Sequence, residues 1–290
     1  MRLPVSVVIP TRDRAWCLPR ALRSVLDQTR RPAEIIVVDD GSLDSTRRLI
    51  RCGFPEVRYL VQPASGVSRA RNLGIENARH PWIALLDSDD AWLPGKLAEQ
   101  WRALQRTPRL LAHTDEIWLR HGEPLRQPRH LRQARAGGWV FENCLERCAI
   151  SPSSALFHQS LWRQAGGFDE RLPACEDYDF WLQITCRHPV LYLEEPLLIK
   201  HGGHADQLSR RIAALDRYRI QALLKVLARG DLADDRRRAA VAVLLEKAHI
   251  VAQGALKRGK IREASEYHKL CRTALLQLRL RWPWRPRRAP

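Results

Sequence analysis

Acidic side chains directly follow two apolar segments of the sequence. The run Asp87–Asp90 comes after Trp82–Leu86, and the run Asp39–Ser42 comes after Glu34–Val38. Carboxylates crowded at the end of a strand repel one another, and a hard divalent cation such as Mg²⁺ or Mn²⁺ relieves that repulsion. Such an ion keeps coordination positions that the oxygens of a diphosphate can fill. The alternative for both runs is a solvated turn that caps the following helix.

A basic segment and a second acidic pair lie farther along the chain. Gly66–Asn72 opens a predicted helix and contains Arg69 and Arg71. Helix-start amides and arginine both bind diphosphates well, although an exposed basic helix face has the same pattern. Glu176 and Asp177 begin another predicted helix, where acidic residues are favourable for electrostatic reasons alone.

Two histidines, His201 and His204, enclose a pair of glycines. The glycines allow a ligand to approach the backbone closely, and either imidazole could bind a metal ion or a phosphate. A purely structural histidine is the alternative. The sequence does not decide which of the two histidines is involved.

Alternating strands and helices must position these side chains. The predicted strands are Val5–Ile9, Glu34–Val38, Val57–Val61 and Trp82–Leu86. The helices predicted between them are Leu18–Leu26, a helix through Cys52 that Ser42 or Asp44 can cap, and Gly66–Ala78. This alternation with short loops predicts a parallel α/β sheet, in which ligands bind beyond the carboxyl ends of the strands. Both acidic runs lie at such ends.

Four motifs of the chain occur in the order and at the spacing of a known family: Val5–Thr11, Val37–Ser42, Gly66–Asn72 and Leu86–Asp90. Together they closely resemble the family 2 glycosyltransferases. The resemblance covers about residues 3–205. It implies the GT-A fold of nucleotide-diphospho-sugar transferases, a Rossmann-like α/β sheet with helices on both faces. We expect a catalytic domain at 1–206, a basic helical C-terminal region at 207–280 and a basic tail rich in Trp and Pro at 281–290.

The resemblance also implies roles for residues at the donor side. Asp40 matches the family aspartate that contacts the nucleobase, and the backbone around Pro10 and Thr11 would hold the nucleoside. Asp87, with Ser88 beside it, matches the first acid of the family's DxD motif, near the ribose. Asp89 matches the acid that holds Mn²⁺ or Mg²⁺ on the diphosphate, and His204 or His201 is expected close to the same ion. Arg71 is expected to bind the diphosphate.

The catalytic base of the family lies on a later acidic pair, which Glu176 and Asp177 match. An acceptor hydroxyl has a pKa far above neutrality, so a carboxylate must take its proton during attack on the anomeric carbon. We assign this role to Asp177, with Glu176 as the second choice. Attack opposite the leaving group in one step would invert the anomeric centre. The family shapes its acceptor pocket at the positions of Arg135–Trp139 and Ser151–Ser154.

Charge is distributed unevenly along the chain. Residues 207–290 contain 21 Lys and Arg against 7 Asp and Glu, whereas residues 1–206 contain 28 against 25. Helices are predicted in this basic region at 208–228, 232–254 and 260–278. Basic residues mixed with Trp suit an anionic membrane surface, with a solvated helical bundle as the alternative. No nucleic-acid reader motif is found, so no nucleic-acid partner is expected.

The remaining composition argues for a cytoplasmic enzyme, in peripheral contact with the inner face of the membrane. Seven cysteines without paired CxxC units do not suggest a disulfide framework or a zinc ribbon, and favour a reducing compartment. The apolar run before Pro10 is too short for a signal peptide, and no apolar stretch approaches the roughly 20 residues of a membrane span.

The expected reaction is transfer of a sugar from a nucleotide-diphospho-sugar to a carbohydrate or lipid-linked acceptor, in cell-surface polysaccharide biosynthesis. One alternative is a nucleotidyltransferase of the same fold, but Pro10–Arg14 lacks the glycines of a phosphate-binding loop. The other alternative is a non-catalytic nucleotide-sugar binding protein. The retained acids Asp40, Asp87, Asp89 and Asp177 argue against it.

Overall fold

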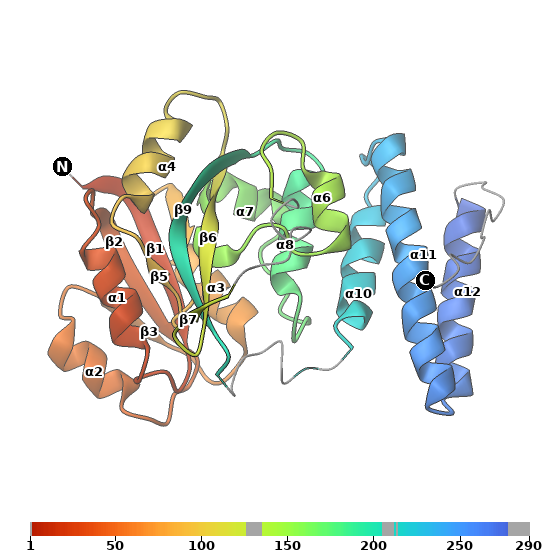
Figure 1. Cartoon of the computed structure of the whole chain (residues 1–290), viewed down its shortest axis with the longest axis horizontal. Coiled ribbons are helices and arrows are strands. Elements are labelled where there is room, and N and C mark those ends of the chain that lie inside the picture. Colours follow the sequence, from red (N-terminus) through yellow and green to blue (C-terminus); the bar gives the residue numbers. More distant parts are fainter. Residues whose placement is uncertain (1, 126–134, 205–211, 213, 278–290) are drawn as a thin grey trace. The chain divides into compact units, whose positions relative to one another are not determined.

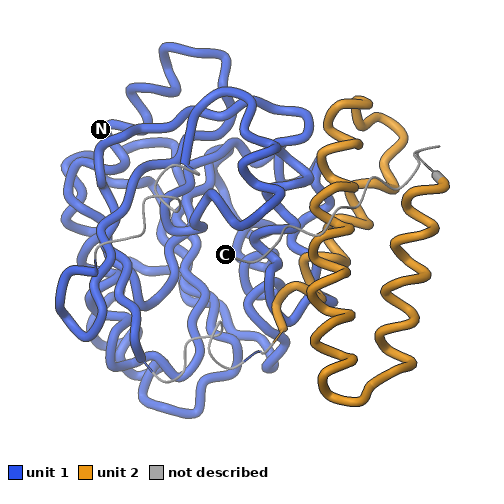
Figure 2. Tube along the Cα trace, turned by 45° about the vertical axis from the view of Figure 1, so that its right-hand side comes forward, with its two compact units in different colours: residues 1–212 blue, residues 213–290 orange. Residues whose placement is uncertain are grey.

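The computed structural model describes residues 2–125, 135–204, 212 and 214–277 (Figure 1). The chain divides into two compact units, residues 1–212 and 213–290 (Figure 2). The boundary expected after residue 206 falls within 205–211, and the tail expected at 281–290 falls within 278–290; both stretches lie outside the described residues.

Unit 1 is built from alternating strands and helices. In chain order these are β1 (Leu3–Thr11), α1 (Leu18–Leu26), β2 (Pro32–Asp39), α2 (Thr46–Gly53), β3 (Arg58–Val61), α3 (Val67–Glu76), β4 (Trp82–Leu85), β5 (Ala91–Trp92), α4 (Lys96–Leu104), β6 (Leu111–Arg120), β7 (Glu123–Pro124), α6 (Phe141–Glu146), the 3-10 turn η1 (Pro152–Ser154), β8 (Leu156–His158), α7 (Gln159–Ala165), α8 (Glu176–Thr185) and β9 (Leu191–Gly202).

These strands form one mixed sheet in the order β3-β2-β1-β4-β8-β6-β9-β5, with β7 paired to β6. β1 pairs in parallel with β2 and β4, and β2 pairs in parallel with β3. β8 runs antiparallel to β4 and to β6, which ends the parallel half of the sheet. Thr11 is in register with Asp39, so the carboxyl ends of β1 and β2 lie side by side.

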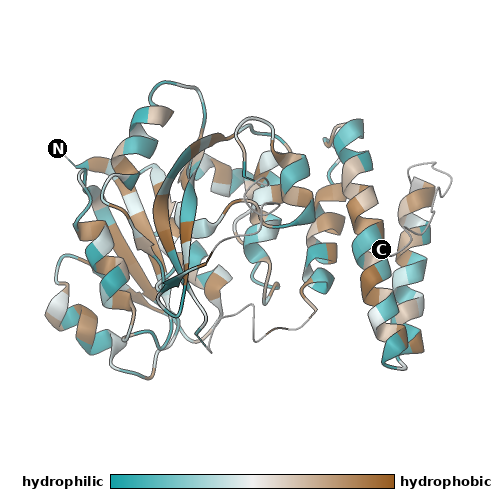
Figure 3. Ribbon diagram, in the orientation of Figure 1, coloured by the Kyte–Doolittle hydropathy of each residue, from teal (hydrophilic) through white to brown (hydrophobic). Residues whose placement is uncertain are grey.

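Apolar side chains on both faces of the sheet attach the helices. On one face, Leu18 and Leu22 of α1 join the same buried cluster as Val7 of β1. On the other face, α3 packs closely on β1, because a Cβ built on Gly74 would lie 2.3 Å from Cγ1 of Val8. The central strands are accordingly among the most hydrophobic segments in Figure 3. A sheet buried on both faces explains the unbroken apolar runs of the sequence.

Unit 2 is helical in its described part, with α10 (Asp216–Leu227), α11 (Asp234–Lys257) and α12 (Ile261–Gln277). The three helices line a half-open pocket of about 670 Å³, in which most of the lining side chains are apolar. Among the described residues, α11 alone has the length and composition that could cross a membrane. A bundle's core helix meets the same criterion, and α11 buries one face that includes Leu244 and Ala248.

The predicted elements agree with the observed ones most closely near the N-terminus. The helix at Leu18–Leu26 has the predicted bounds, and each strand of the parallel half begins and ends within two residues of its prediction. The helix predicted at 208–228 is not continuous, because residues 212, 214 and 215 are not helical and α10 begins at Asp216. Residues 208–211 and 213 lie outside the described residues.

Candidate active site

The carboxyl ends of β1, β2 and β4 bring the predicted donor residues to one edge of the sheet. Pro10 is buried in β1 and paired with Val38. Thr11 ends the same strand, and its buried hydroxyl has no hydrogen-bond partner within the described part of the chain. Ser88 is buried in the acidic run after β4. A buried hydroxyl without a partner at this edge is available to a bound ligand.

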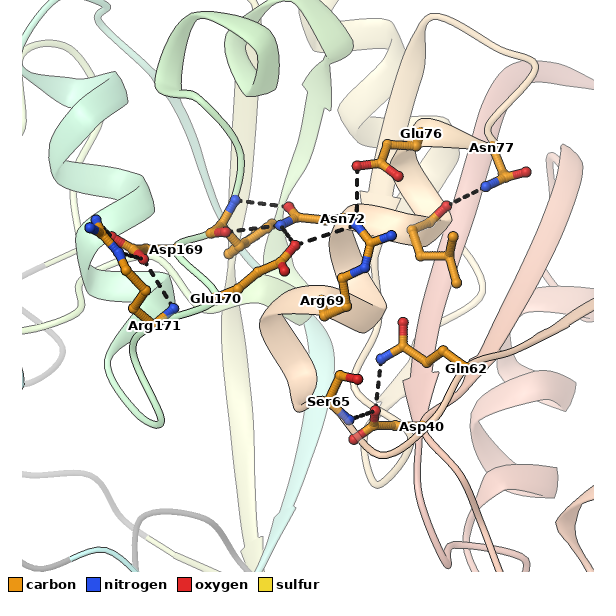
Figure 4. Close-up of polar contacts among 12 residues, drawn as sticks. Asp40, Gln62, Ser65, Arg69, Asn72, Glu76, Asn77, Asp169, Glu170 and Arg171 are labelled. Atoms are coloured by element: carbon orange, nitrogen blue, oxygen red, sulfur yellow. Dashed lines mark hydrogen bonds and ion pairs between the residues drawn. The ribbon is translucent and has the colours of Figure 1, made fainter.

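Asp40 organises the loop that leads into α3 (Figure 4). Its Oδ1 accepts hydrogen bonds from Gln62 Nε2 and from the backbone N–H of Ser65, both at 2.7 Å, and its Oδ2 accepts one from the N–H of Gly66 at 2.9 Å. Gly66 has a φ of 94°, which a residue with a Cβ rarely adopts. Asp40 therefore fixes the start of α3, in addition to the predicted contact with a nucleobase.

Arg71 lies between two carboxylates from different parts of the chain. Its guanidinium donates to Asp87 Oδ1 at 2.8 Å and to Glu176 Oε1 at 2.7 Å, and it stacks over the ring of Phe168 at 5.3 Å. The side chain is only 4% exposed. The sequence predicts Arg71 as a diphosphate ligand, whereas its observed contacts make it a bridge between the end of β4 and the start of α8.

Glu176 and Asp177 differ sharply in their surroundings. Glu176 is buried and paired with Arg71, whereas Asp177 is half-buried and accepts a hydrogen bond from the N–H of Tyr178. Burial raises the pKa of Glu176, and the neighbouring charge of Asp177 raises it further. Cys175, directly before this pair, has a φ of 62°, a strained conformation for a residue other than glycine. The more open carboxylate is that of Asp177.

Asp89 is contacted by two basic side chains through the same oxygen. Arg14 NH1 lies 2.9 Å from Oδ2, and His204 Nε2 lies 2.8 Å from it. Arg20 donates to the backbone carbonyl of Asp89 at 2.7 Å. Burial would raise the pKa of Asp89, but the hydrogen bond with His204 and the charge of Arg14 outweigh it and lower the pKa. The ring of Trp16 lies edge-on to His204, with 5.6 Å between ring centroids.

The contact between Asp89 and His204 fits two ligands of one metal ion. Ligands about 2.1 Å from an octahedral ion and at right angles lie about 3 Å apart, close to the observed 2.8 Å. Within the described ranges, no group of three or more His, Cys, Asp or Glu residues is placed to hold a metal. Among the described residues, Asp89 and His204 would hold the ion, and oxygens of a bound diphosphate could fill further coordination positions.

Of the two histidine candidates, only His204 has its ring on Asp89. His201 instead donates its backbone N–H to Asp90 Oδ1 at 3.3 Å. Asp90 is buried, and its other oxygen accepts a hydrogen bond from Ser153 Oγ at 2.6 Å. The same Ser153 hydroxyl accepts from the N–H of Asp87 at 3.0 Å. Through these hydrogen bonds, Asp90 and Ser153 fix the position of the Asp87–Asp90 run.

Asn72 is a positioning residue that the sequence reasoning did not assign (Figure 4). Its amide nitrogen donates to the carbonyl of Phe168 and to Glu170, both at 2.9 Å, and its oxygen accepts from the N–H of Phe168 at 2.9 Å. The oxygen also accepts from Trp162 Nε1 at 3.1 Å. Asn72 therefore attaches α3 to the loop that precedes Glu176. Asn72 directly follows Arg71 in the Gly66–Asn72 motif, and this position was the sequence feature that could have identified it.

The residues at the family's acceptor positions do not converge on one feature. Arg135 forms ion pairs with Asp115 and Glu116 on β6, and Trp139 is 54% exposed. Ser151 lies just before η1, where its hydroxyl accepts a hydrogen bond from Lys200 Nζ at 3.0 Å. These contacts give no direct support for an acceptor pocket.

Comparison with known proteins identifies the family. The family model described as Glycosyl transferase family 2 matches residues 6–162. An uncharacterized glycosyltransferase of Rickettsia conorii is 31% identical over 219 residues, which are 72% of this chain and 35% of that protein. An uncharacterized protein of Mycobacterium tuberculosis is 30% identical over 237 residues, 74% of each chain. The chain spans about a third of the length of the first rickettsial relatives that it matches.

Solved structures share the fold at low sequence identity. The crystal structure of S. aureus TarS 1-349 superposes with a TM-score of 0.72 at 16% identity, covering 96% of this chain and 81% of that one. The mannosyltransferase PcManGT from Pyrobaculum calidifontis, in complex with GDP-Man and Mn²⁺, superposes with a TM-score of 0.62 at 18% identity, covering 96% and 83%. At this identity the likeness establishes the fold only. The chain belongs to the family 2 glycosyltransferases and has the GT-A fold.

Proposed function

We propose that the chain is a metal-dependent, inverting glycosyltransferase that moves a sugar from a nucleotide-diphospho-sugar to an acceptor hydroxyl. One observation carries the proposal: the Arg71 guanidinium joins Asp87, on the donor side, to Glu176, the neighbour of the candidate base Asp177. A donor site and a base must keep a fixed separation for in-line attack, and a buried arginine bridge gives that rigidity. Solved neighbours in complex with UDP, UDP-GlcNAc or GDP-Man support a nucleotide-sugar donor.

The residues would divide the work as follows. Thr11, Asp40 and the Asp87–Ser88 segment bind the nucleoside, and Asp89 with His204 hold Mn²⁺ or Mg²⁺. A bound divalent ion would neutralise the charge that builds on the departing nucleoside diphosphate. Asp177 takes the proton of the acceptor hydroxyl as the hydroxyl attacks the anomeric carbon. Glu176, held by Arg71, keeps the start of α8 in place.

The acceptor and the location belong to the same proposal. We assign the catalytic role to residues 1–206 and a carbohydrate or lipid-linked acceptor in cell-surface polysaccharide biosynthesis. The basic helical region would contact the anionic inner face of the membrane. The excess of Lys and Arg over Asp and Glu in residues 207–290 supports this contact.

The test is cleavage of the donor. The protein is incubated with UDP-GlcNAc, UDP-glucose or GDP-mannose, with Mn²⁺ or with EDTA, and release of UDP or GDP is measured, with water or a membrane lipid extract as the acceptor. We expect release from one donor only, lost with EDTA and restored by Mn²⁺. The anomeric configuration of the product, read by NMR, should be opposite to that of the donor. Release that EDTA leaves unchanged, or a product with the donor's configuration, would contradict the proposal.

A further inference from the structure

Arg14 occupies the oxygen of Asp89 that the proposed metal site needs. It lies in the loop between β1 and α1, and its NH1 is 2.9 Å from Asp89 Oδ2, the oxygen that also contacts His204. A divalent ion coordinated by Asp89 and His204 would lie about 2.1 Å from this oxygen. The guanidinium and the ion would then be two cations in contact, which repel strongly at such distances. Metal binding at this oxygen therefore favours displacement of Arg14.

Arg14 is better able to move than the other arginine of the site. Its side chain is 15% exposed, against 4% for that of Arg71. Its backbone is fixed, because the carbonyl accepts hydrogen bonds from the N–H groups of Cys17 and Leu18 at the start of α1. A displaced Arg14 side chain therefore remains close to Asp89.

A diphosphate is the natural new partner for a displaced Arg14. An ion shared between Asp89 and a diphosphate brings phosphate oxygens within a few ångströms of the carboxylate that Arg14 left. The planar guanidinium matches phosphate oxygens through paired hydrogen bonds. Arg12, in the same loop and 55% exposed, and Arg20, on the carbonyl of Asp89, add positive charge on the same side.

We infer that Arg14 neutralises Asp89 in the metal-free protein and transfers to the donor diphosphate when the divalent ion binds. The inference rests on the proposed function. It makes Arg14 a positioning residue that couples metal binding to donor binding, because the ion frees Arg14 for the nucleotide. By thermodynamic linkage the nucleotide must raise metal affinity by the same factor.

The experiment measures Mn²⁺ affinity by electron paramagnetic resonance, with and without saturating UDP or GDP. The variants are Arg14→Gln, which removes the cation, and Arg14→Lys, which keeps a charge without the planar fork. Arg20→Gln is the matched control, since it removes an equal charge that binds the carbonyl of Asp89 and not its carboxylate. Asp89→Ala serves to test the metal site itself. Thermal unfolding of each variant confirms that it folds.

We expect Arg14→Gln to bind Mn²⁺ alone at least about tenfold more tightly, because the repulsion between two charges in contact near a protein surface exceeds the free energy of a tenfold change in affinity. Arg20→Gln should change the affinity less than about threefold. The nucleotide should strengthen Mn²⁺ binding by a smaller factor in Arg14→Gln than in the unmodified protein. Arg14→Lys should fall between the two.

If UDP or GDP strengthens Mn²⁺ binding by the unmodified protein and Asp89→Ala abolishes it, the proposed metal site stands. Two results would then overturn the inference about Arg14. The first is an Mn²⁺ affinity of Arg14→Gln equal to or weaker than that of the unmodified protein. The second is an equal gain in Arg20→Gln. If the unmodified protein binds no Mn²⁺ even with UDP or GDP, the metal-dependent function fails as well.

Discussion

Two arginines of unit 1 bind acids of the same short run in opposite ways. Arg71 is buried, joins Asp87 to Glu176 and links segments that are far apart in the sequence. Arg14 is partly exposed and meets Asp89 on an oxygen that also faces His204. A buried arginine that joins two distant segments belongs to the framework, whereas the more exposed Arg14 lies on the carboxylate that we propose as a metal ligand. Asp87 and the proposed metal ligand Asp89, two residues apart in the sequence, thus contact arginines of different kinds.

The bridge should determine which acid of the Glu176–Asp177 pair does chemistry. Because Arg71 binds Glu176 and Asp177 is the more open carboxylate, we propose Asp177 as the base, and Asp177→Asn should lower turnover about 1,000-fold, the range of general-base catalysis. The donor affinity, measured by calorimetry, should change less than about threefold, since the base contacts the acceptor. A variant that loses donor affinity and turnover in parallel would show that Asp177 binds the donor instead.

Removing the bridge should cost more stability than removing any surface arginine. Arg71→Met leaves Asp87 and Glu176 without their buried partner, and the free energy of unfolding should fall by about 3–5 kcal/mol. Arg69→Met is the matched control on the same helix. Arg69 is 38% exposed and its partners Glu76 and Glu170 lie at 3.5 Å, so the loss should stay below about 1 kcal/mol. Urea unfolding of the two variants compares them, and equal losses would remove the distinction between framework and surface.

The pH dependence of stability should separate Glu176 from Glu34, another glutamate paired with an arginine. Burial and then Asp177 raise the pKa of Glu176, so its favourable contribution is present below about pH 4 and is lost as pH rises through its folded-state pKa. Burial would also raise the pKa of Glu34, but hydrogen bonds from the Arg79 N–H, Ser6 and Arg58 outweigh it and lower it. The contribution of Glu34 is therefore present above about pH 4 and is lost on acidification.

The two glutamates can be compared through their amide variants. The destabilisation by Glu34→Gln should grow from pH 3 to pH 6, and that by Glu176→Gln should shrink over the same range as pH rises. Urea unfolding at several pH values in EDTA measures both. If the destabilisation by both variants grows with pH, the charge of Arg71 outweighs the effect of burial on the pKa of Glu176.

The smallest effect is expected at Arg14. Arg14→Gln should change the free energy of unfolding by less than about 1 kcal/mol, because the Arg14 side chain is more exposed than that of Arg71 and Asp89 keeps its contact with His204. Urea unfolding in EDTA is the measurement. A loss as large as that of Arg71→Met would place Arg14 in the framework and remove the contrast between the two arginines.

The spacing of apolar residues was sufficient to predict the helices and strands whose limits depend on local sequence. The helix at Leu18–Leu26 and the central strands follow from apolar spacing, because a sheet buried on both faces requires continuous apolar runs. The start of α10 was mispredicted, since helical spacing continued through residues before Asp216 that are not helical where the structure describes them. Helix limits depend on local capping and tertiary contacts that spacing does not report.

The sequence predicted which acidic residues gather at the candidate site, but it did not predict which side chains contact them. Asp87, Asp89 and Asp177 stand in recognisable motifs, but the hydroxyl of Ser153 and the guanidinium of Arg14 reach the acidic run from 63 to 75 residues away in sequence. Such contacts depend on the sheet order, which places β8 beside β4 and the loop after β1 beside the acids. The same reason explains why His201 and His204 could not be separated: only the folded backbone turns the ring of His204 toward Asp89.

The most direct test of the donor site is nucleotide binding with and without metal. Thermal unfolding is followed for the unmodified protein and for Asp89→Ala with UDP, GDP and other nucleoside diphosphates, each with Mn²⁺ or EDTA. A ligand that binds only the folded protein raises the melting temperature. We predict a rise with one nucleotide that requires Mn²⁺ and disappears in Asp89→Ala. No rise with any nucleotide, or an equal rise in Asp89→Ala, would contradict a metal-dependent donor site at Asp89.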